Sequence, residues 1–265
     1  MLLIVSWFCV VLPLAPPLLG HSVHVPRSNV LVSGEELVYN VRYSFIDLGQ
    51  VKITTLDKVQ TSASLVYNTE ALIQSYPGIP FVDLHATYES VIDTGMFSRH
   101  FIGKSREDNV WDFSIYDFEY ENNRVLMEMG DRDTVVEKND TLWINMSYQD
   151  GLSLFFYARD QLFSGKKMNI PTLVKEQEAN TFIDFKMERT TVETDFVDYP
   201  MDVIHFDGTA EFVGVFGLTG EFEGWFSNDE ARIPILAKMK VIIGSVTLEL
   251  VKWKRLDWKP PRRIE

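Results

Sequence analysis

The chain has 265 residues, of which 46% are hydrophobic and 24% are charged, a composition typical of folded globular proteins and not of disordered ones. Its formal net charge is −13. A surface of that charge repels nucleic-acid phosphates and anionic lipids, so we expect no nucleic-acid partner.

The N-terminal segment predicts export. Residues 2–19 are nearly all apolar, three prolines interrupt the run late, and the small residue Gly20 follows. This is the layout of a secretory signal peptide cleaved near Gly20. We therefore predict a signal peptide over residues 1–20 and a mature chain that is soluble in the periplasm or outside the cell, with no integral membrane span after cleavage.

The only cysteine, Cys9, lies within this segment. The mature chain is therefore expected to contain no disulfide, no zinc-thiolate site and no cysteine nucleophile. An exported protein without disulfides indicates a bacterial envelope compartment, or a fold that is stabilised by its core alone.

The first strand signal covers residues 36–46. One face of this segment is apolar and consists of Leu37, Tyr39, Val41, Tyr43 and Phe45. Alternation with a period of two is the pattern of a half-buried strand. The stretch 47–49 (DLG) is expected to turn the chain, and residues 50–59 to return as the second strand of a hairpin.

Similar strand patterns recur along the rest of the chain. They cover residues 62–73, 110–120, 124–130, 133–138, 180–194, 201–213, 220–227, 232–240 and 244–254. Residues 79–93 fit either a short helix or a strand. Short turns rich in Gly, Asn and Asp join these runs, which favours antiparallel β architecture. We predict a mainly β protein with one domain over residues 21–265, built as a single large sandwich or barrel-like sheet.

One segment breaks the strand pattern. Its apolar residues are spaced as on one face of a helix: Leu152, Phe155, Phe156, Leu162 and Phe163. Asp150 is the expected N-cap, Gly165 the expected residue just after the helix, and two lysines suit its C-terminal end. A helix over about residues 150–164 is therefore predicted, packed on a sheet edge or closing the mouth of a barrel.

Three motifs carry a family resemblance. The first is a Gly-Glu-x-Leu-x-Tyr strand over 34–39, the second is a helix with Asp150, Ser153 and Arg159, and the third is a Ser-x-Asp-x-x-Arg-x-Pro turn over 227–234. In this order they resemble the exported bacterial proteins of domain-of-unknown-function family 3108, over about residues 34–255. The resemblance implies a mostly β, exported, soluble protein and implies no activity.

The third motif is interpreted as a structural turn made by Ser227, Asp229, Arg232 and Pro234. The Asp229 side chain is expected to accept N–H groups of the turn, and Arg232 to pair with that carboxylate. Pro234 suits the start of a strand. Adjacent acids on an extended chain point opposite ways, which argues against acid–base chemistry at this turn.

The aromatic content supplies the candidate ligand-binding residues. The chain has 18 Phe, 10 Tyr and 6 Trp, and large curved β-sheets often enclose an apolar cavity. The candidates sit at expected inward positions: Tyr39, Phe45, Phe155, Phe185 and Phe226. The alternative is an aromatic core with no ligand. The five histidines form no metal-spaced pair, so no metal or cofactor is expected.

Three functions follow from these features. The first is a non-catalytic exported envelope protein that binds an apolar or lipid-like ligand, or an envelope partner. The second is a carbohydrate-binding or carbohydrate-active protein that uses exposed tryptophans and paired acids. The third is a structural subunit of an envelope assembly. We favour a protein without catalytic activity, because no serine-hydrolase elbow or metalloprotease motif occurs in the chain.

Overall fold

The computed structural model describes residues 29–61, 64–79, 83–107, 110–131, 135–212, 220–241 and 244–264. The predicted signal peptide and Cys9 lie outside the described residues. Within the described residues, no helix combines the length and the apolar character needed to cross a bilayer.

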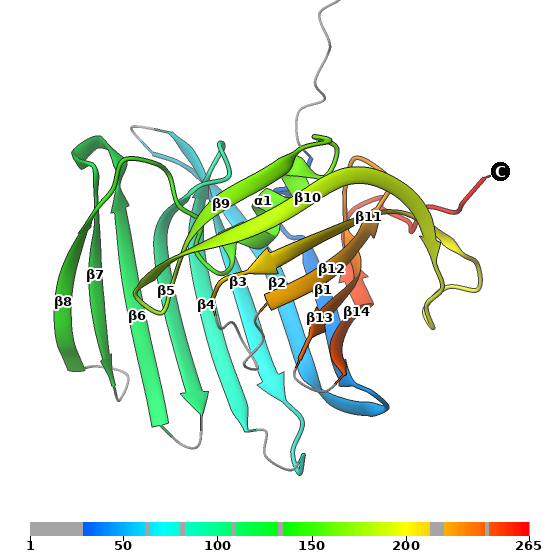
Figure 1. The fold of residues 1–265 in the computed structure, drawn as a ribbon, viewed down its shortest axis with the longest axis horizontal. Helices are drawn as coiled ribbons and strands as arrows, with labels where there is room; N and C mark the ends of the chain where they lie inside the picture. The colour runs from blue at the N-terminus through cyan, green and yellow to red at the C-terminus, as the bar shows by residue number, and fades with distance from the viewer. Residues whose placement is uncertain are drawn as a thin grey trace, which may run out of the picture.

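The described chain folds into one antiparallel sheet of 14 strands (Figure 1). The strands are β1 (Glu36–Tyr43), β2 (Ile46–Gln60), β3 (Leu65–Ser75), β4 (Leu84–Asp93), β5 (Ser98–Glu107), β6 (Val110–Glu119), β7 (Arg124–Asp131), β8 (Val135–Trp143), β9 (Lys167–Val174), β10 (Gln177–Val192), β11 (Met201–Ala210), β12 (Gly220–Ser227), β13 (Pro234–Lys240) and β14 (Ser245–Lys254). A short 3-10 turn, η1 (Tyr120–Asn122), precedes β7. The prediction of a mainly β, barrel-like sheet with one packed helix is confirmed.

The strand order is β8-β7-β6-β5-β4-β3-β2-β1-β14-β13-β12-β11-β10-β9, so β8 and β9 are the two edges and the sheet is not closed. The sequence patterns predicted most of these strands. They left β4 undecided and missed β5 and β9, because charged residues and Pro171 break the alternation there.

The first hairpin turns earlier than predicted. The turn lies at Ser44 and Phe45, and Ser44 adopts a left-handed φ of 54°. Asp47 instead lies in β2 as its second residue, where its carboxylate accepts hydrogen bonds from the side chains of Asn40 and Arg42. Gly49 lies within β2, opposite Val41.

Gly49 is required by close packing and not by a turn. A Cβ atom at this position would lie 2.2 Å from the carbonyl oxygen of Gln74 on β3. A glycine therefore allows β2 and β3 to approach closely beside the bulge that offsets β1 from β2.

The curled sheet surrounds the helix α1 (Ser153–Gln161). Figure 1 shows α1 between the β9–β10 hairpin and the wall formed by the earlier strands. Phe156 packs into the core of β1, β2 and β14, whereas Ala158 and Leu162 pack against residues of β10, β11 and β12. The helix therefore joins two separate hydrophobic clusters.

The helix is shorter than predicted, with nine residues. Asp150 lies before it and accepts hydrogen bonds from the backbone N–H groups of Leu152 and Ser153, both at 2.7 Å. This is the N-terminal role that the sequence suggested. Gly165 has a φ of +65° after the last turn, as expected for the residue that ends a helix.

Candidate functional site: an internal cavity

The inner face of the curled sheet encloses a cavity of about 700 Å³. Strand register identifies this face, because directly opposed residues of an antiparallel pair share a side. One such row passes from Phe101 to Tyr116 to Met127 across β5, β6 and β7. The volume lies within the range of about 300–1,000 Å³ typical of ligand pockets.

The middle of the cavity is apolar and aromatic. Its aromatic lining residues include Tyr88, Phe101, Phe155, Phe206, Phe222 and Phe226. Two of the rings lie over glycines on the neighbouring strand: Phe206 covers Gly224, and Phe222 covers Gly208. Glycine at these positions gives each ring room to lie flat against the sheet.

One face of α1 bounds the cavity. Leu154, Phe155 and Ala158 line it, together with Gly151 just before the helix, and they follow the i, i+3, i+4, i+7 spacing of one helical face. The opposite face carries Phe156, which is fully buried in the core. We call the end of the sheet that holds α1 the helix end.

At the other end of the cavity, the wall formed by β5–β8 is polar and reaches exposed residues, whereas Phe222 and Met239 keep the facing wall apolar. We call this end the turn end, because the β1–β2 and β9–β10 turns lie there. Ser105 and Asp112 oppose each other on β5 and β6, and Asp131 opposes Asp112 on β7. Lys138 and Lys175 also line this end, and both are exposed. The cavity therefore grades from an apolar region beside the helix to a charged opening.

The β9–β10 turn lies across the opening between the two edge strands, β8 and β9, which do not pair with each other. Its two residues, Lys175 and Glu176, have φ values of 48° and 60°, as in a tight two-residue hairpin turn. The backbone N–H of Glu176 donates to the hydroxyl of Tyr116 at 3.0 Å, and the hydroxyl of Ser114 donates to the Glu176 carboxylate at 3.3 Å. Side-chain contacts thus hold the hairpin against β6, where no strand ladder forms.

The tyrosines that line the cavity are uncharged at neutral pH. Burial raises the pKa of Tyr88 to about 12, and burial also raises the pKa of Tyr116. Burial raises the pKa of Tyr39 well above its ordinary value. These hydroxyls are therefore neutral; that of Tyr116 accepts the N–H of Glu176, whereas that of Tyr39 has no hydrogen-bond partner among the described residues.

The predicted ligand-binding residues divide into three groups. Tyr39, Phe155 and Phe226 line the cavity. Phe185 is fully buried against Phe206 in the core between α1 and β10, and it is not among the lining residues. The expected inward position of Phe45 is wrong: its side chain is 87% exposed, because the hairpin turns at this residue.

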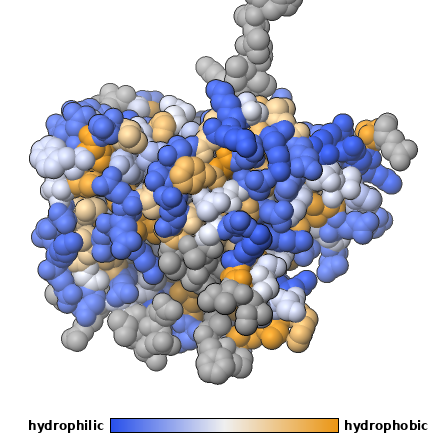
Figure 2. Space-filling model, viewed as in Figure 1, coloured by the Kyte–Doolittle hydropathy of each residue, from blue (hydrophilic) through white to orange (hydrophobic). Residues whose placement is uncertain are grey.

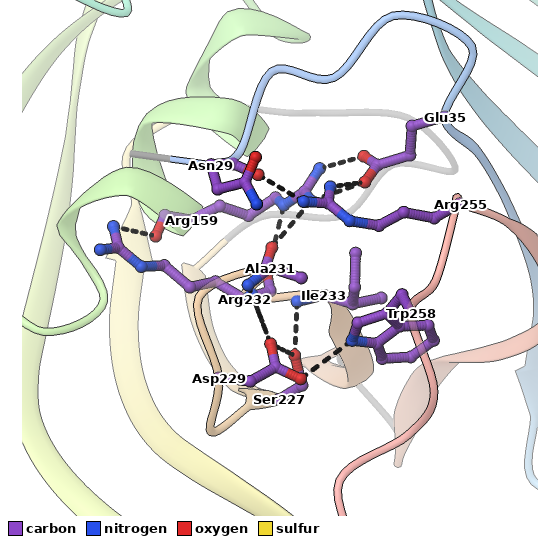
Figure 3. Close-up of polar contacts among 10 residues, drawn as sticks. All are labelled: Asn29, Glu35, Arg159, Ser227, Asp229, Ala231, Arg232, Ile233, Arg255 and Trp258. Atoms are coloured by element: carbon purple, nitrogen blue, oxygen red, sulfur yellow. Dashed lines mark hydrogen bonds and ion pairs between the residues drawn. The ribbon is translucent and has the colours of Figure 1, made fainter. Parts of the chain in front are cut away.

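A buried ion-pair network fixes α1 at the helix end (Figure 3). Glu35 precedes β1 and pairs with Arg159 of α1, with Oε1 2.6 Å from Nη1. Arg255, just after β14, pairs with the same carboxylate. The side chains of these three residues are between 0% and 4% exposed. One carboxylate therefore joins the helix to both ends of the described chain.

The 227–234 turn packs beneath this network. The Asp229 carboxylate accepts hydrogen bonds from the N–H groups of Ala231 and Arg232, both at 3.0 Å. It also accepts a bond from the hydroxyl of Ser227, and that hydroxyl in turn accepts the N–H of Ile233 at 2.7 Å. Asp229 thus organises the turn from within, as the sequence suggested.

Arg232 has different partners from those predicted. Its guanidinium donates to the carbonyl groups of Arg159 and Asp160 at the end of α1, and its ion pair is with Asp160 at 3.8 Å, not with an acid of its own turn. The guanidinium of Arg159 donates in return to the carbonyl of Ala231 at 3.0 Å (Figure 3). The turn therefore anchors the helix. Pro234 begins β13.

Asp150 forms a second buried centre at the N-terminus of α1. Its carboxylate accepts hydrogen bonds from the hydroxyls of Ser90 at 2.6 Å and Ser98 at 2.5 Å, which lie on β4 and β5. Burial raises the pKa of Asp150, although these hydrogen bonds oppose the change. The two ends of α1 are thus tied to opposite halves of the sheet.

The basic C-terminal segment after β14 is docked against the rest of the fold. Trp258 donates to the Asp229 carboxylate at 2.9 Å, and the carbonyl of Pro260 accepts a hydrogen bond from Tyr199. The carbonyl of Pro261 accepts the N–H of Asp202 at 2.9 Å.

Comparison with known proteins places the chain in a family. A family model described as "Protein of unknown function (DUF3108)" matches residues 38–251. The chain belongs to this family. The resemblance drawn from the three sequence motifs is therefore confirmed. Among curated proteins, none matches the sequence.

One solved structure supports the fold of this DUF3108 protein. The chain is similar to a β-barrel-like protein of domain of unknown function DUF1849 from Brucella abortus, with 12% sequence identity and a TM-score of 0.59. The match covers 86% of this chain and 100% of that chain. A protein from Bacteroides fragilis NCTC 9343 with a YmcC-like fold matches with 7% identity and a TM-score of 0.35, over 85% of this chain and 98% of that one.

Other candidate sites are weaker. Among Trp111, Trp143, Trp225, Trp253 and Trp258, Trp143 is the most exposed, at 72%. Trp225 is stacked against His205, and Trp253 packs against Trp258. In the part of the chain that the structure describes, no three His, Cys, Asp or Glu side chains gather in a way that could hold a metal ion.

Sequence reasoning missed the polar residues of the cavity. Ser105, Ser114 and Tyr116 occur in strands whose inward face mixes small, polar and aromatic residues. Ser105 lies on β5, which the sequence pattern missed; the alternation along β6 shows that Ser114 and Tyr116 share a face. It does not show that this face looks into a cavity.

Proposed function

We propose that the protein is an exported, non-catalytic binding protein that holds an apolar or lipid-like ligand in the internal cavity. The observation that carries this proposal is the cavity itself: about 700 Å³, mostly aromatic and aliphatic in the middle, and polar at one end. A few polar groups around an apolar pocket are typical of small-molecule binding sites. The apolar segment 1–20 supports the exported location.

The acidic surface also fits this role. Figure 2 shows mostly hydrophilic side chains on the face that carries the β9–β10 hairpin. With a net charge of −13, the protein is expected to remain in solution while an apolar ligand is shielded in its interior.

The first test is direct. The mature protein is purified under native conditions, extracted with organic solvent, and the extract is analysed by mass spectrometry for co-purified lipids. In parallel, the emptied protein is titrated with the fluorescent apolar dye 1-N-phenylnaphthylamine. We expect a lipid-like compound in the extract and saturable dye binding at one site.

Two neighbouring substitutions on β6 provide the control. Ser114 lines the cavity, whereas Ile115 is the next residue along the strand and is not among the lining residues. Ser114→Trp should weaken dye binding by about tenfold or more, because the ring occupies the cavity near its opening. Ile115→Trp should bind as the unmodified protein does. Equal dye binding by both variants, or no binding by any form, would contradict the proposal.

A further inference from the structure

The polarity of the cavity lining differs between its two ends. At the helix end the cavity is bounded by the apolar face of α1, namely Leu154, Phe155 and Ala158, and at the turn end it reaches exposed polar residues. From Phe101 to Ser105 on β5 the lining advances by four residues, or about 13 Å at the usual rise of a strand. An elongated molecule with one apolar end and one polar end matches this gradient.

The boundary at α1 is rigid. Asp150 ties its start to β4 and β5, and the carboxylate of Glu35 ties Arg159 near its end to the segments that flank β1 and β14. Arg232 binds the carbonyl groups of its last turn. A helix fixed at both ends cannot retreat from a ligand that is too long for the cavity. Its cavity-facing side chains therefore limit the length of the ligand.

The charges at the turn end limit the polar group of the ligand. The charged side chains that line this end are Asp112, Asp131, Glu137, Lys138, Lys175 and Glu176. Four of them are acidic and two are basic, and the whole chain is strongly acidic. A carboxylate or phosphate would be repelled at this position, whereas hydroxyl groups could bond to Ser105, Ser114 and the acids.

We propose that the ligand is a single-chain amphiphile with an uncharged, hydroxyl-bearing head, bound with its chain end against α1 and its head at the turn end. Leu154 and Ala158 then act as specificity-determining residues that set the longest chain accepted. This inference rests on the proposed function and deepens it.

The experiment uses a series of saturated monoacylglycerols whose chains lengthen by two carbons at a time. Each is titrated against the mature protein by displacement of the same dye. Affinity should rise by roughly fourfold for each methylene that becomes buried, and should stop rising when the chain end meets α1. The chain length at which affinity stops rising is the quantity compared between variants.

Two substitutions on α1 should move this limit in opposite directions. Ala158→Phe fills the space beside the helix and should shift the limit to shorter chains, whereas Leu154→Ala opens space and should shift it to longer chains. Gln161→Ala is the matched control, because Gln161 lies on the same helix outside the cavity lining. If Ala158→Phe does not fold, the Leu154→Ala variant alone decides the question.

The possible results separate the two proposals. If no chain length displaces the dye and none binds, the proposed function fails. If the chains bind but the limiting chain length is the same in Leu154→Ala, in Ala158→Phe and in the control, α1 does not set the length of the ligand. This inference is then overturned. A fatty acid of the best chain length should bind at least several-fold more weakly than the monoacylglycerol; equal or tighter binding would refute the uncharged head.

Discussion

The buried network at the helix end provides a sharp test of the structure. Glu35 is 2% exposed and is the shared partner of two arginines whose side chains are 0% and 4% exposed. Replacing Glu35 by Gln preserves the size of the side chain and removes its charge. The two guanidinium groups then remain buried with no carboxylate between them, and the new amide N–H₂ group faces other donors.

The expected cost follows from the geometry. Removing one partner of a buried ion pair destabilises a protein by about 3–5 kcal/mol, mainly because the remaining charge has no partner. Since one carboxylate serves two arginines here, we expect the upper part of this range, about 4–5 kcal/mol. For a protein of this size each kcal/mol lowers the melting temperature by about 2–4 °C, so the expected decrease is about 8–20 °C.

The assay is thermal unfolding at neutral pH, followed by circular dichroism in the β region. Glu221→Gln is the matched control, because its ion pair with Lys240 is on the surface, with both side chains more than half exposed; this variant should melt as the unmodified protein does. Combining Glu35→Gln with Arg255→Met should cost less than the sum of the two single changes, since one unpaired charge is removed. If Glu35→Gln had the same melting temperature as the control, the buried network would be refuted.

Three further predictions concern single positions. Burial raises the pKa of Asp150 above its unfolded value, so the folded state holds the proton more strongly; the associated stabilisation is complete at acidic pH and is lost as pH rises through the folded pKa. The stability of the unmodified protein relative to Asp150→Asn should therefore decrease from about pH 4 upwards in urea unfolding, and a constant difference would contradict this. Gly49→Ala should cost about 1–3 kcal/mol because its Cβ would clash with the Gln74 carbonyl, whereas Gly151→Ala, which meets nothing within 4 Å, should leave the urea midpoint unchanged; equal midpoints would argue against the close approach of β2 and β3. Arg232→Ala should lower the free energy of unfolding by about 1–3 kcal/mol, because two carbonyl groups at the end of α1 lose their donor. If this variant had the same urea midpoint as the unmodified protein, the turn would not anchor the helix.

Local patterns in the sequence were sufficient for most of the strands and for the helix, but not for β4, β5 and β9. The two-residue repeat of a strand was enough to predict the strand over residues 36–46. Helical spacing and capping were enough to predict the helix that follows Asp150. The turn at 227–234 was also predictable, because Asp229 satisfies N–H groups two and three residues away.

Other features depend on contacts between distant parts of the chain. The pairing of Arg159 with Glu35 joins residues 124 positions apart, and no local pattern specifies such a partner. The same reasoning explains the error at Phe45: alternation continues through the residue, but the hairpin turns there and exposes the ring.

The sequence by itself determined that this protein is an antiparallel β structure with one helix, because hydrogen-bonding geometry imposes a period of two on strands and 3.6 on helices. Only the tertiary structure decided which faces look inward. The sheet curls as β1 pairs with β14, and that pairing places α1 inside and leaves a cavity between residues far apart in the chain. Whether an inward aromatic fills a core or lines a binding site depends on the space left by the opposite wall, which is a property of the assembled fold.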